Sequence, residues 1–265
     1  MKKTGIVCTM VICLATSGFS RASNALDLYL ATPEHEIEDL RKELKDTKKL
    51  RECALRLASS AWHLRWISSD QAEKFKQISG VSDKALEAAM LDIIREWSAK
   101  GWPAWQGPDA PLDVRLGYAY LTGAITWLGF CADTEGKKLM MDIAMDRTKH
   151  SDFRGYAMGS YLSRANEKEM LSALPRFLAD DAGIPIYPFD VCFFALWHYN
   201  KAEDNPQKRE AILAALSVAL TNEKGKKAFA EADKNLAERS KEYAESPQRK
   251  AALERINKPP EEKAP

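Results

Sequence analysis

A three-residue pattern recurs at nearly constant spacing in the middle of this chain and restricts its architecture more than any other feature. The triplets Asp113-Val114-Arg115, Asp152-Phe153-Arg154 and Asp190-Val191-Cys192 begin 39 and then 38 residues apart. Two apolar segments of helical character follow each triplet: 116–130 and 138–145, 155–164 and 169–178, 193–199 and 210–220. A period near forty with two helices per unit is typical of an α-solenoid. The sequence therefore predicts an all-α fold in which helical hairpins stack as a short solenoid.

Residues 111–222, which carry this pattern, resemble HEAT repeats, in which an acidic residue in the turn precedes an apolar residue and an arginine at the start of the second helix. The third copy departs from the pattern, with Cys192 in place of the arginine. The role that we expect for the triplet rests on general chemistry. An aspartate at a helix start accepts hydrogen bonds from free backbone N–H groups, and the arginine can pair with an aspartate of the same or the next unit. Asp152 and Arg154 are therefore expected to be structural.

The region before the repeats, residues 26–100, is expected to contain three helices. The first is predicted from Glu34 to Ile67, because its apolar residues recur at steps of three and four. A second begins at Ser69 or Asp70, and a third, from Asp83 to Ala99, is capped by Ser82.

Two further segments follow the repeat region, which we place at residues 112–222. Residues 223–256 are rich in Ala, Glu, Lys and Arg with a thin apolar stripe, which predicts one charged helix that caps the stack. Residues 257–265 combine prolines and charges and are expected to form a disordered tail.

The first 25 residues have the composition of a secretory signal peptide. A basic start (Lys2, Lys3) precedes an apolar run from Gly5 to Ala15, and a small, polar stretch ends in Ser23-Asn24-Ala25. Cleavage is expected after Ala25, with Ala22 as a second candidate. The eleven apolar residues are too few for a membrane span, which needs about 20. The chain is therefore expected to be exported to the periplasm or the extracellular space, with no transmembrane segment after cleavage.

Cysteine and charge usage add two exclusions. Cys13 follows Ile12 rather than a small residue, so a lipoprotein is not expected. Loss of Lys2, Lys3 and Arg21 with the signal peptide changes the formal charge from +1 to −2, which argues against a nucleic-acid partner. The remaining cysteines, Cys53, Cys131 and Cys192, are expected to be small buried hydrophobic residues, although one disulfide with one free thiol also fits an exported protein.

Residues 101–111 form the clearest internal boundary, because they contain two glycines and three prolines and show no helical or strand period. Trp97, Trp102 and Trp105 cluster at this loop. Two interpretations remain open for these indoles: they fill the seam between the two helical halves, or they form an exposed platform on which a ligand such as a sugar ring stacks.

No recognisable catalytic motif, metal-ligand spacing or phosphate-binding loop occurs in the chain, and no cofactor or metal is expected. His198 is the histidine of most interest, since it lies among aromatic residues at the end of an apolar helix, where a helix C-terminus favours its charged form. A buried structural histidine is the competing interpretation.

These observations lead to two main functional hypotheses. The first is an exported, non-enzymatic interaction or scaffold protein that binds an unidentified protein partner across the surface of its stacked helices. The second is an exported carbohydrate-binding or carbohydrate-active protein with a glycan ligand at Trp97, Trp102, Trp105 and His198. Coiled-coil pairing through residues 34–49 is a third, weaker hypothesis.

Overall fold

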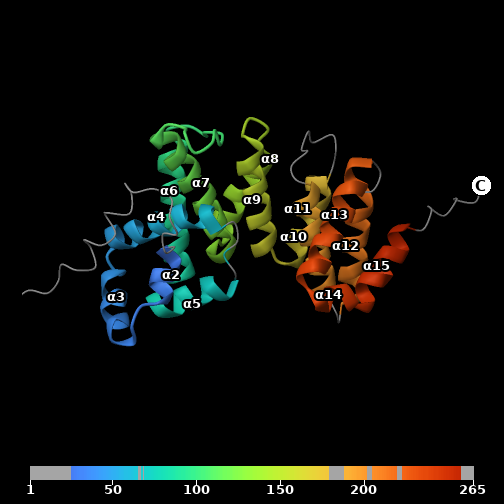
Figure 1. The fold of residues 1–265 in the computed structure, drawn as a ribbon, viewed down its shortest axis with the longest axis horizontal. Helices are drawn as coiled ribbons and strands as arrows, with labels where there is room; N and C mark the ends of the chain where they lie inside the picture. Colours follow the sequence, from blue (N-terminus) through green and yellow to red (C-terminus); the bar gives the residue numbers. More distant parts are fainter. Residues whose placement is uncertain are drawn as a thin grey trace, which may run out of the picture.

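The computed structural model describes residues 25–64, 67, 69–178, 188–201, 205–219 and 223–257, and all regular secondary structure in these ranges is helical. Figure 1 shows the helices side by side in one elongated stack that follows the order of the sequence. The predicted all-α class with stacked helical hairpins is therefore confirmed. The predicted signal peptide before Ala25 and the tail after Asn257 lie outside the described ranges.

The N-terminal region begins with α2 (Ala25–Leu30), the short 3₁₀ helix η2 (Glu34–Glu36) and α3 (Ile37–Glu43). It continues with α4 (Thr47–Leu64), α5 (Ser69–Ser79) and α6 (Asp83–Ser98). Ser82 caps α6 as predicted, because its hydroxyl accepts the Ala85 N–H at 3.2 Å.

The prediction of one continuous helix from Glu34 to Ile67 is wrong. A turn at residues 44–46 separates α3 from α4, and the Asp46 carboxylate accepts the Lys49 N–H at 3.0 Å, so Asp46 acts as the cap that starts α4. A helix of seven residues carries only one heptad, so the coiled-coil hypothesis for residues 34–49 loses its basis.

The described residues of the repeat region form six helices in the predicted order. They are α7 (Leu112–Cys131), α8 (Thr134–Met145), α9 (Ser151–Arg164), α10 (Glu167–Leu178), α11 (Pro188–Lys201) and α12 (Pro206–Ala219). α7 packs against α4, α6 and α9, while α8 packs on α9, and α10 packs along α12. The loop predicted at residues 101–111 contains no helix and connects α6 to α7.

The C-terminal range predicted as a single helix contains three: α13 (Glu223–Arg239), α14 (Lys241–Glu245) and α15 (Pro247–Asn257). Two serines account for the breaks. The Ser240 hydroxyl accepts the Tyr243 N–H at 3.2 Å, and the Ser246 hydroxyl accepts the Arg249 N–H at 3.1 Å, so each serine starts a new helix. α13 packs on α11 at the C-terminal end of the stack.

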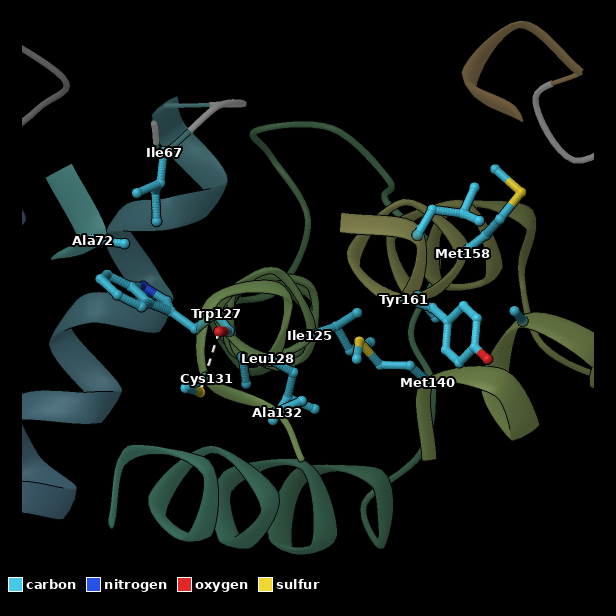
Figure 2. Close-up of a cluster of buried hydrophobic side chains, with 14 of the residues drawn as sticks. Ile67, Ala72, Ile125, Trp127, Leu128, Cys131, Ala132, Met140, Met158 and Tyr161 are labelled. Atoms are coloured by element: carbon cyan, nitrogen blue, oxygen red, sulfur yellow. Dashed lines mark hydrogen bonds between the residues drawn. The ribbon is translucent and has the colours of Figure 1, made fainter. Parts of the chain in front are cut away.

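The core is centred on α7, which is apolar on nearly all sides. Figure 2 shows Trp127 pointing from α7 toward Ile67 and Ala72, while Ile125 points the opposite way toward Met140 and Met158. A helix that is apolar all round must be covered on several sides, and the helices packed around α7 meet that requirement. None of the described helices is long and apolar enough to cross a membrane.

Candidate functional site

The loop between α6 and α7 rests on the first turns of α7. Gly101 and Gly107 have φ angles of 121° and 95°, which L-residues with side chains rarely adopt, so these two positions let the loop turn sharply. Pro103 lies against Gly117, where an added Cβ would be 3.2 Å from the Pro103 ring. The missing side chain at Gly117 thus lets the loop approach the helix closely.

Two of the three clustered indoles are partly covered by neighbouring side chains. The Trp97 ring lies 4.8 Å from the Tyr120 ring, and the Lys100 ammonium lies 3.7 Å from the Trp97 ring centre. The Trp102 ring meets Phe153 edge-on at 5.0 Å, with the Lys149 ammonium 5.1 Å away. Trp97 therefore lies between α6 and α7, and Trp102 lies between the loop and α9; both residues are partly buried.

Trp105 differs from the other two. Its ring packs at 5.5 Å against Tyr118 of α7, yet 37% of the residue is exposed. Leu112, at the start of α7, is 62% exposed. Among the described residues only four large hydrophobic residues are exposed, and two of them lie on or next to this loop. We refer to Trp105 and Leu112 as the Trp105 surface.

Polar groups border the Trp105 surface. The Tyr118 hydroxyl donates to the Asp152 carboxylate at 2.9 Å, which links α7 to α9. The same carboxylate lies 3.5 Å from Nδ1 of His150, and this nitrogen accepts the Asp152 N–H at 3.3 Å. Neither Tyr118 nor His150 was among the site residues predicted from the sequence. Tyr118 lies five residues after Asp113, and the equivalent positions of the other two repeat copies are Ala157 and Ala195. This difference was the sequence feature that could have identified Tyr118 as a site residue.

The contacts of Asp152 and Arg154 differ from those predicted for the triplet residues. Asp152 lies inside the first turn of α9, which is capped by His150, and its carboxylate accepts a hydrogen bond from the Tyr118 hydroxyl. Arg154 does not pair with an aspartate: its Nε donates to the Ala144 carbonyl oxygen at the end of α8, at 3.1 Å. Arg154 is buried, and this burial lowers the pKa of its guanidinium. Both residues nevertheless have the structural character expected of them.

His198 cannot be joined to this surface. It belongs to α11, and its side chain lies outside the part of the chain that the structure describes. In Figure 1 the loop between α6 and α7 and helix α11 lie in different halves of the stack, with α8 and α9 between them. Of the four residues predicted as a binding set, Trp105 is the exposed one at the loop, and the set as a whole stays a prediction.

The three described cysteines are free and buried, which confirms the prediction of small hydrophobic residues. Burial raises the thiol pKa of Cys53 to about 11 and that of Cys192 to about 12, and it also raises the pKa of Cys131. Within the described ranges, no group of three or more His, Cys, Asp or Glu side chains is placed to hold a metal ion.

Comparisons with known proteins add no assignment, since no protein-family model, curated protein or solved structure matches the chain. The resemblance of residues 111–222 to HEAT repeats stays a prediction.

Proposed function

We propose that this protein is an exported, non-enzymatic scaffold that binds a protein partner through the Trp105 surface. The observation that carries the proposal is the exposure of Trp105 on the packed ring of Tyr118, with a second exposed apolar residue, Leu112, at the start of α7. Protein interfaces concentrate their binding energy in a few large, centrally placed side chains, among which tryptophan is strongly enriched.

The base beneath Trp105 strengthens this proposal. Tyr118 packs on Phe153 at 5.5 Å, and its hydrogen bond to Asp152 holds it in place. An indole that rests on a fixed ring loses little conformational freedom when a partner covers it, and less of the binding free energy is spent on ordering. Leu112 would extend the apolar contact along the start of α7.

A carbohydrate ligand is the second candidate, and a separate observation favours it. The carboxylate of Asp152 and the imidazole of His150 lie close to the tyrosine that supports Trp105. Sugar rings stack on exposed indoles while their hydroxyls bond to carboxylates. This candidate uses Trp105 alone, because Lys100 and Lys149 lie against the rings of Trp97 and Trp102.

The test is capture of binding partners from an envelope fraction by immobilised mature protein, repeated with the double variant Trp105→Ala/Leu112→Ser. Leu28→Ser is the matched control, because Leu28 is 44% exposed but lies on α2. We expect one protein to be retained by wild type and by Leu28→Ser and lost by the double variant. The affinity of the double variant for the purified partner should be about thirtyfold lower than that of wild type, as expected for loss of an aromatic anchor.

Two outcomes would count against the protein-scaffold proposal. One is capture that is identical for the double variant and the control, because the bound proteins would then not use the Trp105 surface. The other is saturable binding of soluble oligosaccharides that disappears with Trp105→Ala, which would support the carbohydrate candidate instead.

A further inference from the structure

An open groove lies between α8 and α10, on a different part of the stack from the Trp105 surface. The ion pair between Lys137 Nζ and Glu169 Oε2, at 2.8 Å, links the two helices. α10 packs along α12, whereas α8 packs on α9. The space left between α8 and α10 has a volume of about 320 Å³, which is at the lower end of the range for small-molecule sites.

Tyr161 of α9 lines the groove and is only 8% exposed. Its ring packs edge-on against Phe177 at 6.2 Å, which fixes its position. No described residue hydrogen-bonds its hydroxyl. Burial, assisted by the Glu169 carboxylate, raises the pKa of this hydroxyl above its ordinary value of 10.0, so it is protonated and can donate at neutral pH, as an ordinary tyrosine can. Met141 of α8 adds apolar surface beside it.

The charges along the groove are balanced but incompletely paired. The described lining includes three cations and three carboxylates: Lys137, Lys138, Arg176, Asp133, Asp142 and Glu169. Lys137 and Glu169 neutralise each other, and the Asn166 N–H also donates to the Glu169 carboxylate at 2.8 Å, which anchors the pair on α10. Arg176 on α10 and Asp142 on α8 make no side-chain hydrogen bond or ion pair with another described residue. Outside that pair, two cations (Lys138 and Arg176) and two carboxylates (Asp133 and Asp142) remain in the lining. A ligand that matches this balance is neutral overall and carries charge of both signs.

We propose that this groove binds a short peptide with free termini, of roughly two or three residues in view of its volume. The peptide carboxylate binds Arg176, whose planar guanidinium suits a two-point contact with a carboxylate. The peptide ammonium binds Asp142 on the opposite wall. Tyr161 donates its hydroxyl proton to a peptide oxygen, and an apolar side chain of the ligand packs on Met141. This site is independent of the proposed scaffold function.

Isothermal titration calorimetry with the dipeptide alanyl-leucine tests the proposal on the purified mature protein. The variants are Arg176→Gln and Asp142→Asn, and the control is Lys168→Gln, an exposed lysine of α10 outside the groove lining. We expect saturable binding to wild type and to Lys168→Gln, and a loss of about tenfold in affinity for each of the other variants. Melting curves show whether each variant is folded.

Two blocked peptides assign the ends of the ligand. Alanyl-leucinamide lacks the carboxylate, so its weaker binding should be insensitive to Arg176→Gln. N-acetyl-alanyl-leucine lacks the ammonium, so its binding should be insensitive to Asp142→Asn. The proposal is overturned if wild type shows no saturable heat with alanyl-leucine at millimolar concentration, or if binding survives both substitutions unchanged.

Discussion

The indole N–H of Trp127 donates to the main-chain carbonyl oxygen of Leu57 at 3.2 Å and joins α7 to α4 across 70 residues of sequence. Trp127 is fully buried, and its ring packs edge-on against Phe75 at 5.7 Å. One turn earlier on α7, Gly123 lies directly against α4: a Cβ at this position would be 1.8 Å from the Ala58 carbonyl oxygen. The N-terminal region and the repeat region therefore share one core.

Gly123→Ala should destabilise the protein by about 3 kcal/mol or more, because the new methyl group would collide with backbone and force α7 away from α4. Urea denaturation measures the change in the free energy of unfolding. Gly117→Ala is the control, since its new methyl group would meet side chains and no backbone: the Pro103 ring at 3.2 Å and the Trp97 ring at 3.6 Å. Equal stability of the two variants would contradict the close approach of α4 and α7.

Trp127→Phe should cost about 2–3 kcal/mol, because the smaller ring leaves a cavity and the Leu57 carbonyl oxygen loses its donor. The same urea measurement applies, with Trp97→Phe as the partly exposed comparison. A loss no greater than that of Trp97→Phe would mean that the Trp127–Leu57 hydrogen bond is not formed.

Asp233→Ala should loosen the C-terminal helices. The Asp233 carboxylate accepts two hydrogen bonds from the Arg249 guanidinium, each at 2.8 Å, and one from the Tyr243 hydroxyl at 2.9 Å. Loss of one partner of a buried charge pair typically costs about 3 kcal/mol. Hydrogen exchange should become faster in α13 to α15 and stay unchanged in α7. The exposed neighbour Lys234→Ala is the control, and similar exchange in both variants would exclude this role for Asp233.

Acid should weaken the link between α8 and α10. The hydrogen bond from Lys137 holds the pKa of Glu169 below its ordinary value of 4.5 in the folded protein. Such a group adds stability above its unfolded pKa, and this contribution disappears as the pH falls through the lower, folded value. The melting temperature should therefore fall less for Lys137→Gln than for wild type when the pH is lowered from 7 to below 4. The exposed Lys168→Gln should retain the wild-type pH dependence; if Lys137→Gln does so as well, this assignment fails.

The buried thiols should react only after unfolding. The raised pKa values of Cys53 and Cys192, about 11 and 12, keep both thiols protonated and unreactive at pH 8, and the burial of Cys131 has the same effect. Iodoacetamide followed by peptide mass spectrometry should find all three unmodified in buffer and all three modified in urea. Rapid labelling of the folded protein at any of them would contradict its burial.

Much of the secondary structure could be predicted from local signals. Ser82 and Gly80 mark the start of α6 and the break before it, and the prolines and glycines of residues 101–111 mark the loop. Asp46 could also have been recognised as a helix cap, but the spacing of apolar residues continues through it and suggested one helix. Ser240 and Ser246 were missed in the same way, because the thin apolar stripe of residues 223–256 runs across them.

The candidate site was only partly predictable. Clustering of Trp97, Trp102 and Trp105 in sequence identified the region, but which indole stays exposed depends on side chains from α7 and α9. Tyr120 and Phe153 pack against Trp97 and Trp102, whereas the fixed ring of Tyr118 leaves Trp105 accessible. The groove left no sequence signal, since its walls come from three helices and its charges are common surface residues.

The sequence by itself determined that the chain is helical and built from hairpins of near-constant length, because periodicity, caps and breakers act over a few residues. The tertiary structure decided which groups meet across long separations. The start of α8 illustrates this: the N–H groups of Asp133 and Gly136 are bound by the carboxylate of Glu87, from α6, at 2.9 and 2.8 Å. No local pattern shows such a cap, because the donor and acceptor come together only when α6 and α8 are packed around α7.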